Sequence, residues 1–126
     1  MPQIFMMIAP LAQRKVQGKT LDDLGRALIS DVEKVYGLEG ERDVAFTALN
    51  LVHTIGEADI QIEIRYTVGT DEYEKGKIFD PSEEKKRELV DKITRTVKEN
   101  PDLGFLTVSV WIKPIRESVF SWVKSA

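Results

Sequence analysis

Residues 60–68 read IQIEIRYTV, and this stretch decides the fold class of the chain. Apolar and polar side chains alternate along it, which is the pattern of a β-strand with one buried face. The apolar side consists of Ile60, Ile62, Ile64, Tyr66 and Val68. The polar side carries Gln61, Glu63, Arg65 and Thr67, so the opposite face of the strand meets water or a wet interior.

A second strand precedes this one, after a short connection that contains turn residues. Residues 44–55 read VAFTALNLVHTI, and the connection over residues 56–59 reads GEAD. Two apolar runs separated by so short a polar segment are typical of consecutive strands.

Toward the N-terminus, residues 3–9 (QIFMMIA) are typical of a mostly buried strand, which Pro10 ends because proline cannot donate to a strand ladder. Residues 11–19 then form a polar connector. We expect Thr20 to cap a helix, with Asp23 in capping-box spacing, and the helix to end at Gly37. Its apolar stripe is Leu21, Leu24, Leu28, Val32 and Val35.

A second helix follows the polar loop over residues 69–79 (GTDEYEKGKIF). We expect Asp80 as its cap and Pro81 as its first residue, ahead of first-turn carboxylates. The helix ends near Asn100 and Pro101, and its apolar stripe is Leu89, Val90, Ile93 and Val97. A last strand is predicted over residues 105–113 (FLTVSVWIK).

The predicted order is therefore β-α-β-β-α-β, two βαβ units within a single α+β domain over residues 1–126. The strands that flank each helix should be parallel and joined by a right-handed crossover. Four strands with two helices on one face leave the other face uncovered. That face faces solvent or lines an interior formed by several subunits; it carries Gln61, Glu63, Arg65, Thr67, Thr107, Ser109, Trp111 and Lys113.

Composition excludes several classes of function. The net charge is −3 with both signs interspersed, which provides no electrostatic footprint for nucleic acid. Cysteine is absent, so disulfides and thiolate chemistry are excluded, and a lone histidine, His53, predicts no metal site. No apolar run is long enough to span a membrane, and we expect a cytoplasmic protein.

Proline at position 2 is the feature that suggests chemistry. Removal of Met1 would leave its ring nitrogen as a secondary amine, and a terminal amine has a reference pKa of ~7.7 to 8.0. Apolar surroundings lower such a pKa because they disfavour the charged form, so the amine could act as a general base. If Met1 remains attached, the nitrogen is an amide. The alternative is a structural proline that simply begins a strand.

A Met-Pro start ahead of a β-α-β-β-α-β chain of this length resembles the tautomerase superfamily. Its members include 4-oxalocrotonate tautomerase, 5-(carboxymethyl)-2-hydroxymuconate isomerase and macrophage migration inhibitory factor. The segment VSVWIKPIRESVFSW, residues 108–122, is similar to a bacterial family of unknown function in that superfamily. The same element order also describes ferredoxin-like domains.

The resemblance implies a homotrimer with Pro2 as catalytic base, acting on a small 2-oxo or 2-hydroxy acid without cofactor or metal. Cationic side chains or backbone amides would hold the substrate carboxylate and the enol oxygen. By position, the residues that the resemblance implicates in substrate binding are Arg42, Arg116, Arg14, the backbone amide of Val68, Ser109, Trp111 and Phe120, with Trp122 beside Phe120 in a C-terminal apolar wall.

Each implied role has a structural alternative. The arginines could be solvated surface charges, and Arg65 could form a cross-strand or intersubunit ion pair. Trp111 and Phe120 could anchor a subunit contact. The rival function is a non-catalytic trimeric or dimeric module that binds a small ligand or a protein, the dimer being expected of a ferredoxin-like domain.

Overall fold

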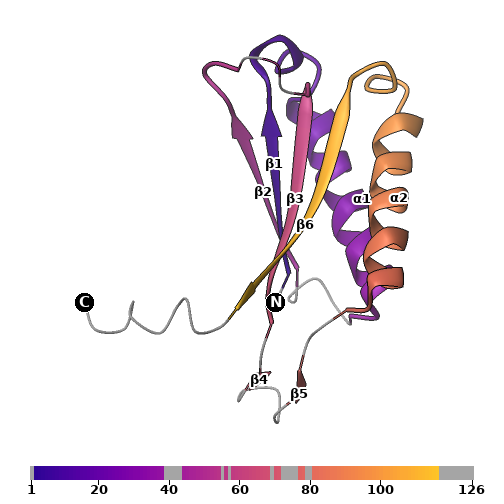
Figure 1. Ribbon diagram of the computed structural model, residues 1–126. Helices are drawn as coiled ribbons and strands as arrows, with labels where there is room; N and C mark the ends of the chain where they lie inside the picture. The colour runs from indigo at the N-terminus through magenta and orange to yellow at the C-terminus, as the bar shows by residue number, and fades with distance from the viewer. Residues whose placement is uncertain are drawn as a thin grey trace.

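The computed structural model describes residues 2–38, 44–54, 56, 58–68, 70–71, 77–78 and 81–116. Four strands within these residues form one sheet in the order β2-β1-β3-β6. Two helices, α1 (Gly18–Tyr36) and α2 (Glu83–Glu99), cover the same face of that sheet, as Figure 1 shows. The strands are β1 (Gln3–Ile8), β2 (Ala45–Asn50), β3 (Ile60–Val68) and β6 (Val108–Arg116). The predicted order and layer arrangement are thus confirmed.

Strand directions follow from the two crossovers. β1 runs parallel to β2 on either side of α1 in the chain, and β3 runs parallel to β6 on either side of α2. The two βαβ units meet at the centre of the sheet, where β1 and β3 pair antiparallel from Gln3 opposite Arg65 to Ile8 opposite Ile60. The prediction of parallel strands within each unit is correct.

The core lies between the sheet and the two helices. The even-numbered residues of β1, and those of β3 from Ile60 to Tyr66, are buried, which confirms the alternation on which the fold class was predicted. The helices contribute their predicted stripes, with Leu28 of α1 and Ile93 of α2 also at 0% exposure. Each such side chain contributes roughly 1.5–3 kcal/mol through removal of apolar surface from water. The connector after β1 also joins the core, since Ala12 and Val16 are buried.

The C-terminus of α1 is as predicted, but its start is not. Gly37 ends the helix in the left-handed conformation at φ 67°, and its N–H donates to the Glu33 carbonyl. Helix α1 begins at Gly18, after Gln17, which makes no side-chain cap. Gln17, in an extended conformation, occupies the N-cap position. Thr20 is therefore a residue of the first turn rather than the cap.

Helix α2 is capped by Ser82 rather than by Asp80. The Ser82 hydroxyl accepts a hydrogen bond from the Lys85 backbone N–H at 3.2 Å, so Pro81 precedes the cap instead of opening the helix. Asp80 lies outside the described residues. The predicted end is confirmed, since Asn100 is the C-terminal cap.

The end of β2 is set by the end of its parallel neighbour, β1. β2 stops at Asn50 rather than at residue 55, because Ile8 is the last residue of β1 with which it can pair. The Gln13 side chain closes this end by donating to the carbonyls of Ile8 and Leu51, at 3.1 and 2.7 Å.

At the other edge of the sheet, β6 begins at Val108 and not at 105, and it continues through Pro114 to Arg116. An edge strand tolerates proline because one side of it has no ladder to complete. The loop between β3 and α2, predicted without regular structure, contains a short antiparallel pair formed by β4 (Thr70–Asp71) and β5 (Lys77–Ile78). A single 3-10 turn, η1 (Pro10–Ala12), follows β1.

Candidate active site

Pro2 lies at one end of the molecule, directly ahead of β1. Strands β3 and β6 finish at this end, α1 finishes there and α2 starts there (Figure 1). Pro2 is buried, and its carbonyl accepts a hydrogen bond from the Ala45 N–H at 3.3 Å. The hydrogen bonding between β1 and β2 therefore extends to the backbone of Pro2.

Tyr66 lies at the same end of the sheet as Pro2. The antiparallel ladder of β1 and β3 ends with Gln3 opposite Arg65; Tyr66 is the next residue of β3, and Pro2 directly precedes β1. Tyr66 is only 2% exposed, and the Tyr36 ring at the end of α1 meets it edge-on with centroids 6.2 Å apart. Burial, and then the neighbouring Tyr66, raises the pKa of the Tyr36 hydroxyl. This end of the core is therefore aromatic and poorly hydrated.

One cation reaches this aromatic cluster from the first turn of α2. Lys86 donates to the Glu83 carboxylate at 3.1 Å and also interacts with the Tyr66 side chain. The hydrogen bond to Glu83 raises the pKa of Lys86, burial opposes that effect, and Tyr66 adds to the rise. The Lys86 side chain is 19% exposed and that of Glu83 is 78% exposed, so the cation is the more enclosed of the two.

The opposite face of the sheet, which we call the helix-free face, is partly polar as expected. It consists of the outward residues of the four strands: Gln3, Phe5, Met7, Ala45, Thr47, Leu49, Gln61, Glu63, Arg65, Ser109, Trp111 and Lys113. At its centre, Glu63 is 4% exposed and receives Lys113 Nζ at 2.6 Å and Arg65 Nε at 2.9 Å. Arg65 also lies over the Phe5 ring, 4.5 Å from its centroid. Arg65 thus pairs with a carboxylate of its own strand, and not across strands as one of the two predicted alternatives had it.

Burial pushes the pKa of Glu63 upward, but the hydrogen bonds from Lys113 and Arg65 outweigh it and leave that pKa below its usual value. The folded state therefore gains stability above the unfolded-state pKa, and this gain is lost as the pH falls through the folded-state pKa. We expect Glu63→Gln to lower the free energy of unfolding by about 1 kcal/mol at pH 7, since both cations are about half exposed.

Urea unfolding of Glu63→Gln and the parent at pH 7 and at pH 3.5 measures this contribution. The difference between the two proteins should shrink at the lower pH. A difference that stays the same or grows there would contradict the role of the Glu63 charge.

The residues predicted to bind substrate fall in different places. Val68 and Arg116 pair with each other at the ends of β3 and β6, at the same end of the sheet as Pro2. Arg14 is exposed in the turn after η1, at the opposite end of β1, so one chain does not bring it to Pro2. Arg42, Phe120 and Trp122 lie outside the described residues.

Ser109 and Trp111 lie on the helix-free face, opposite Gln61 and Glu63, rather than on the side of the sheet that holds the Tyr66 cluster. Trp111 is 54% exposed. Within one chain, neither residue joins Pro2. They could join it only in an assembly in which a second copy presents this face.

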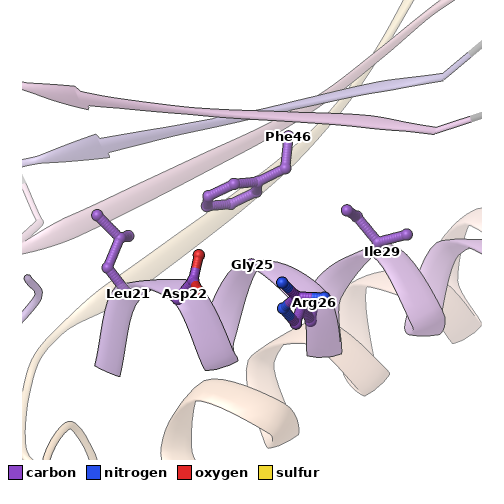
Figure 2. Close-up of a pocket in the computed structure, with 6 residues that line it drawn as sticks. All are labelled: Leu21, Asp22, Gly25, Arg26, Ile29 and Phe46. Atoms are coloured by element: carbon purple, nitrogen blue, oxygen red, sulfur yellow. The ribbon is translucent and has the colours of Figure 1, made fainter. Parts of the chain in front are cut away.

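Among the described residues, two grooves border the helices, and Pro2 lines neither of them. Figure 2 shows the first groove, which has a volume of about 380 Å³. There the Phe46 ring of β2 lies over α1 between Leu21 and Ile29. Gly25 makes this approach possible, because a Cβ there would lie 2.9 Å from two atoms of the Phe46 ring. The second, of about 420 Å³, runs between α2 and β6 and includes Lys86 and Ile112.

In the part of the chain that the structure describes, no group of three or more histidine, aspartate or glutamate side chains is placed to bind a metal ion. No helix in that part has the length and apolarity needed to cross a membrane. The strand role expected for His53 is wrong, because His53 is an exposed residue beyond the end of β2.

Sequence reasoning missed the cluster of Tyr36, Tyr66 and Lys86 at the Pro2 end of the sheet. Tyr66 was assigned to the buried stripe of its strand, which is correct but says nothing of its partner. Lys86 belongs to the charged run SEEKKRE, residues 82–88, which is typical of a solvated helix face. Lys86 lies three residues, about one helical turn, before Leu89, which belongs to the buried stripe of α2. In the sequence, only this spacing indicates that Lys86 points inward.

No protein-family model matches the sequence, and no curated protein matches it. Solved structures match nearly its whole length. A fused 4-OT symmetric trimer has 16% identity and a TM-score of 0.59, covering 92% of this chain and 87% of that one. The 5-carboxymethyl-2-hydroxymuconate delta-isomerase has 13% identity and a TM-score of 0.61, covering 94% and 83%. N1, a member of the cis-3-chloroacrylic acid dehalogenase family, has 10% identity and a TM-score of 0.61, covering 90% and 75%.

These three proteins share the arrangement of elements with this chain over most of both lengths, at identities too low to carry more than the fold. The expectation drawn from the N-terminal proline and the element order is confirmed at that level: the chain has the fold of the tautomerase superfamily.

Proposed function

We propose that this chain is an isomerase of the tautomerase type, which moves a proton within a small 2-oxo or 2-hydroxy acid. The observation that carries the proposal is the position of Pro2, buried at the head of β1 in a fold shared with a delta-isomerase and a fused 4-OT. The fold alone does not define a reaction, since many activities can share one fold. The proline adds the chemistry, because release of Met1 turns its ring nitrogen into a base.

In the proposed reaction the Pro2 nitrogen removes a proton from the carbon next to a carbonyl, and negative charge develops on the enol oxygen. The same nitrogen then returns the proton to another carbon of the conjugated acid, so the reaction needs no external oxidant or reductant. A backbone N–H at Val68 would stabilise the oxygen, and Arg116 or Arg42 would pair with the substrate carboxylate. Val68 and Arg116 are at the correct end of the sheet for these roles.

The proposal includes a homotrimer. The helix-free face exposes large apolar side chains, with Trp111 at 54% and Leu49 at 45%, and nothing within the described part of the chain covers them. Exposed aromatic and aliphatic groups on one face are typical of a subunit contact. In a trimer, Ser109 and Trp111 of one subunit would approach the Pro2 end of the next. Light scattering should give three chains; two chains would instead favour the ferredoxin-like dimer.

The test compares two N-termini of the same protein. Intact-mass spectrometry first establishes a preparation in which Pro2 is the first residue. Ketonisation of 2-hydroxymuconate and phenylenolpyruvate is then measured for that protein and for a form with one extra residue before Pro2, which keeps the ring nitrogen in an amide. We expect turnover only with the free amine, lower by about 10²-fold or more in the extended form. Equal rates above background would refute the base, and absence of turnover in both would favour the non-catalytic binding module.

A further inference from the structure

The first groove, between α1 and β2, combines apolar walls with two charged side chains. Leu21 and Ile29 point from α1 toward the sheet, on either side of the Phe46 ring (Figure 2). Asp22 and Arg26 line the same groove from the same helix. Its volume of about 380 Å³ is at the lower end of the range for small-molecule sites. The groove therefore has the size and the mixed lining of a site for a small ligand.

The charges of Asp22 and Arg26 are unpaired, although the two residues are about one helical turn apart. Side chains four residues apart on a helix are neighbours, with Cβ atoms about 5–6 Å from each other. Among the described residues, however, neither side chain forms an ion pair or a hydrogen bond, with the other or with any third residue. A negative and a positive group on one wall of the groove are therefore available to a ligand.

The second groove, between α2 and β6, shows the same pattern with its acid neutralised. Both grooves are lined by an acidic residue, an arginine four residues later and an aliphatic residue three further on: Asp22, Arg26 and Ile29 in the first, and Glu83, Arg87 and Val90 in the second. Lys86 occupies the position that Gly25 has in the first groove, and its ammonium donates to Glu83 at 3.1 Å. Gly25 has no side chain that could neutralise its acid in this way, so the first groove keeps a free carboxylate.

The two grooves also differ in how apolar they are. Among the described residues, four charged side chains and two aliphatic ones line the second groove, with Asp91 as the second acid. The first has one acid, one arginine and three large apolar side chains. Its closest packing is at Gly25, where a Cβ would lie 2.9 Å from the Phe46 ring. The first groove is thus the one that suits a ligand with one charge of each sign and an apolar body.

We propose that the first groove binds a free α-amino acid with an apolar side chain. Such a molecule has an ammonium and a carboxylate on one carbon. Asp22 accepts a hydrogen bond from the ammonium, and Arg26 donates to the carboxylate, for which the fork of a guanidinium is well shaped. The side chain of the ligand lies against the Phe46 ring and is removed there from water. A peptide does not match this pattern, because its amino and carboxyl termini belong to different residues.

This site is separate from the proposed reaction centre, since Pro2 does not line the first groove. The inference therefore does not rest on the proposed function.

The experiment is a titration of ¹⁵N-labelled protein with L-leucine, followed through the amide NMR signals. We expect saturable shifts at Leu21, Gly25 and Phe46, with a dissociation constant of about 1 mM for so small a ligand in an open groove. Leucinamide lacks the carboxylate and N-acetyl-leucine lacks the positive charge, and each should bind about tenfold more weakly or worse. Glycine keeps both charges but has no apolar side chain, and it should show a similar loss.

Two variants test the charges of the protein. Asp22→Asn and Arg26→Gln each remove one charge and keep a polar side chain, and each should weaken leucine binding by about tenfold or more. The matched control is Arg87→Gln, because Arg87 is an exposed arginine that lines the second groove; this variant should bind leucine like the parent. All three positions are exposed, and circular dichroism at 222 nm confirms that each variant is folded.

Absence of saturable shifts at the first groove up to about 50 mM leucine overturns the proposal. Equal binding of leucine and N-acetyl-leucine also overturns it, because the groove would then select only an anion, and equal binding of leucinamide does so for a cation. An equal loss in Arg87→Gln would place the ligand elsewhere. The titration needs neither removal of Met1 nor turnover, so its outcome is independent of the proposed isomerase.

Discussion

Replacing Pro2 by alanine is expected to lower kcat/KM for ketonisation by about 10²-fold, the effect of losing a well-placed general base. Alanine leaves a primary amine, which can still accept a proton but lacks the ring that fixes the direction of the lone pair. The carbonyl of residue 2 would still accept from the Ala45 N–H, so the strand should form as before. Steady-state rates over pH 5–9 measure the loss.

Pro101→Ala provides the matched control. Pro101 is an exposed residue in the turn after α2, at the end of the molecule away from Pro2, so this variant should retain the parent rate. Comparable losses in both variants would show that a general effect of proline removal, rather than a missing base, explains the result.

The largest effect on stability is expected from Ile62→Ala. Ile62 is fully buried in the middle of β3, where it is flanked by Met6 of β1 and Val110 of β6. Truncation removes apolar contacts and leaves a cavity that two neighbouring strands cannot collapse around. We expect a loss of about 3 kcal/mol in the free energy of unfolding.

Urea denaturation checks this value at one fixed protein concentration, since assembly would contribute to the apparent stability. The midpoint should fall while the slope m stays the same. Glu84→Ala, an exposed change on α2, should shift the free energy of unfolding by no more than about 0.5 kcal/mol. A loss below about 1 kcal/mol in Ile62→Ala would contradict the packing of the central strand.

The sequence predicts those features of the fold that depend on neighbouring residues, and it does not predict those that depend on contacts between distant segments. β3 matches the predicted residues 60–68 because alternation is a property of the strand itself. The end of α1 at Gly37 was predictable for the same reason, since glycine readily adopts a positive φ. The end of β2 was not, because it depends on where β1 stops, and β1 is distant in sequence.

The site was predictable only in part. Pro2 could be singled out because its chemistry depends on its place in the chain. Tyr66 and Lys86 could not, since a tyrosine on a buried stripe and a lysine in a charged run each have an ordinary structural explanation. The position of Tyr66 at the Pro2 end of the sheet follows from the antiparallel register of β1 and β3, which no local pattern specifies.

The antiparallel junction of β1 and β3 gives the chain an approximate dyad between its two halves. Rotation about that axis carries the start of β1 onto the start of β3, at the far end of the sheet. There the Asp59 backbone nitrogen is an amide that donates to the Thr107 hydroxyl at 2.9 Å. The chain thus contains two related corners, and at the corner ahead of β3 the backbone nitrogen is held in a peptide bond and a hydrogen bond. Under the proposed function, a duplicated architecture therefore has one such base per chain, and the second corner serves as a structural clasp.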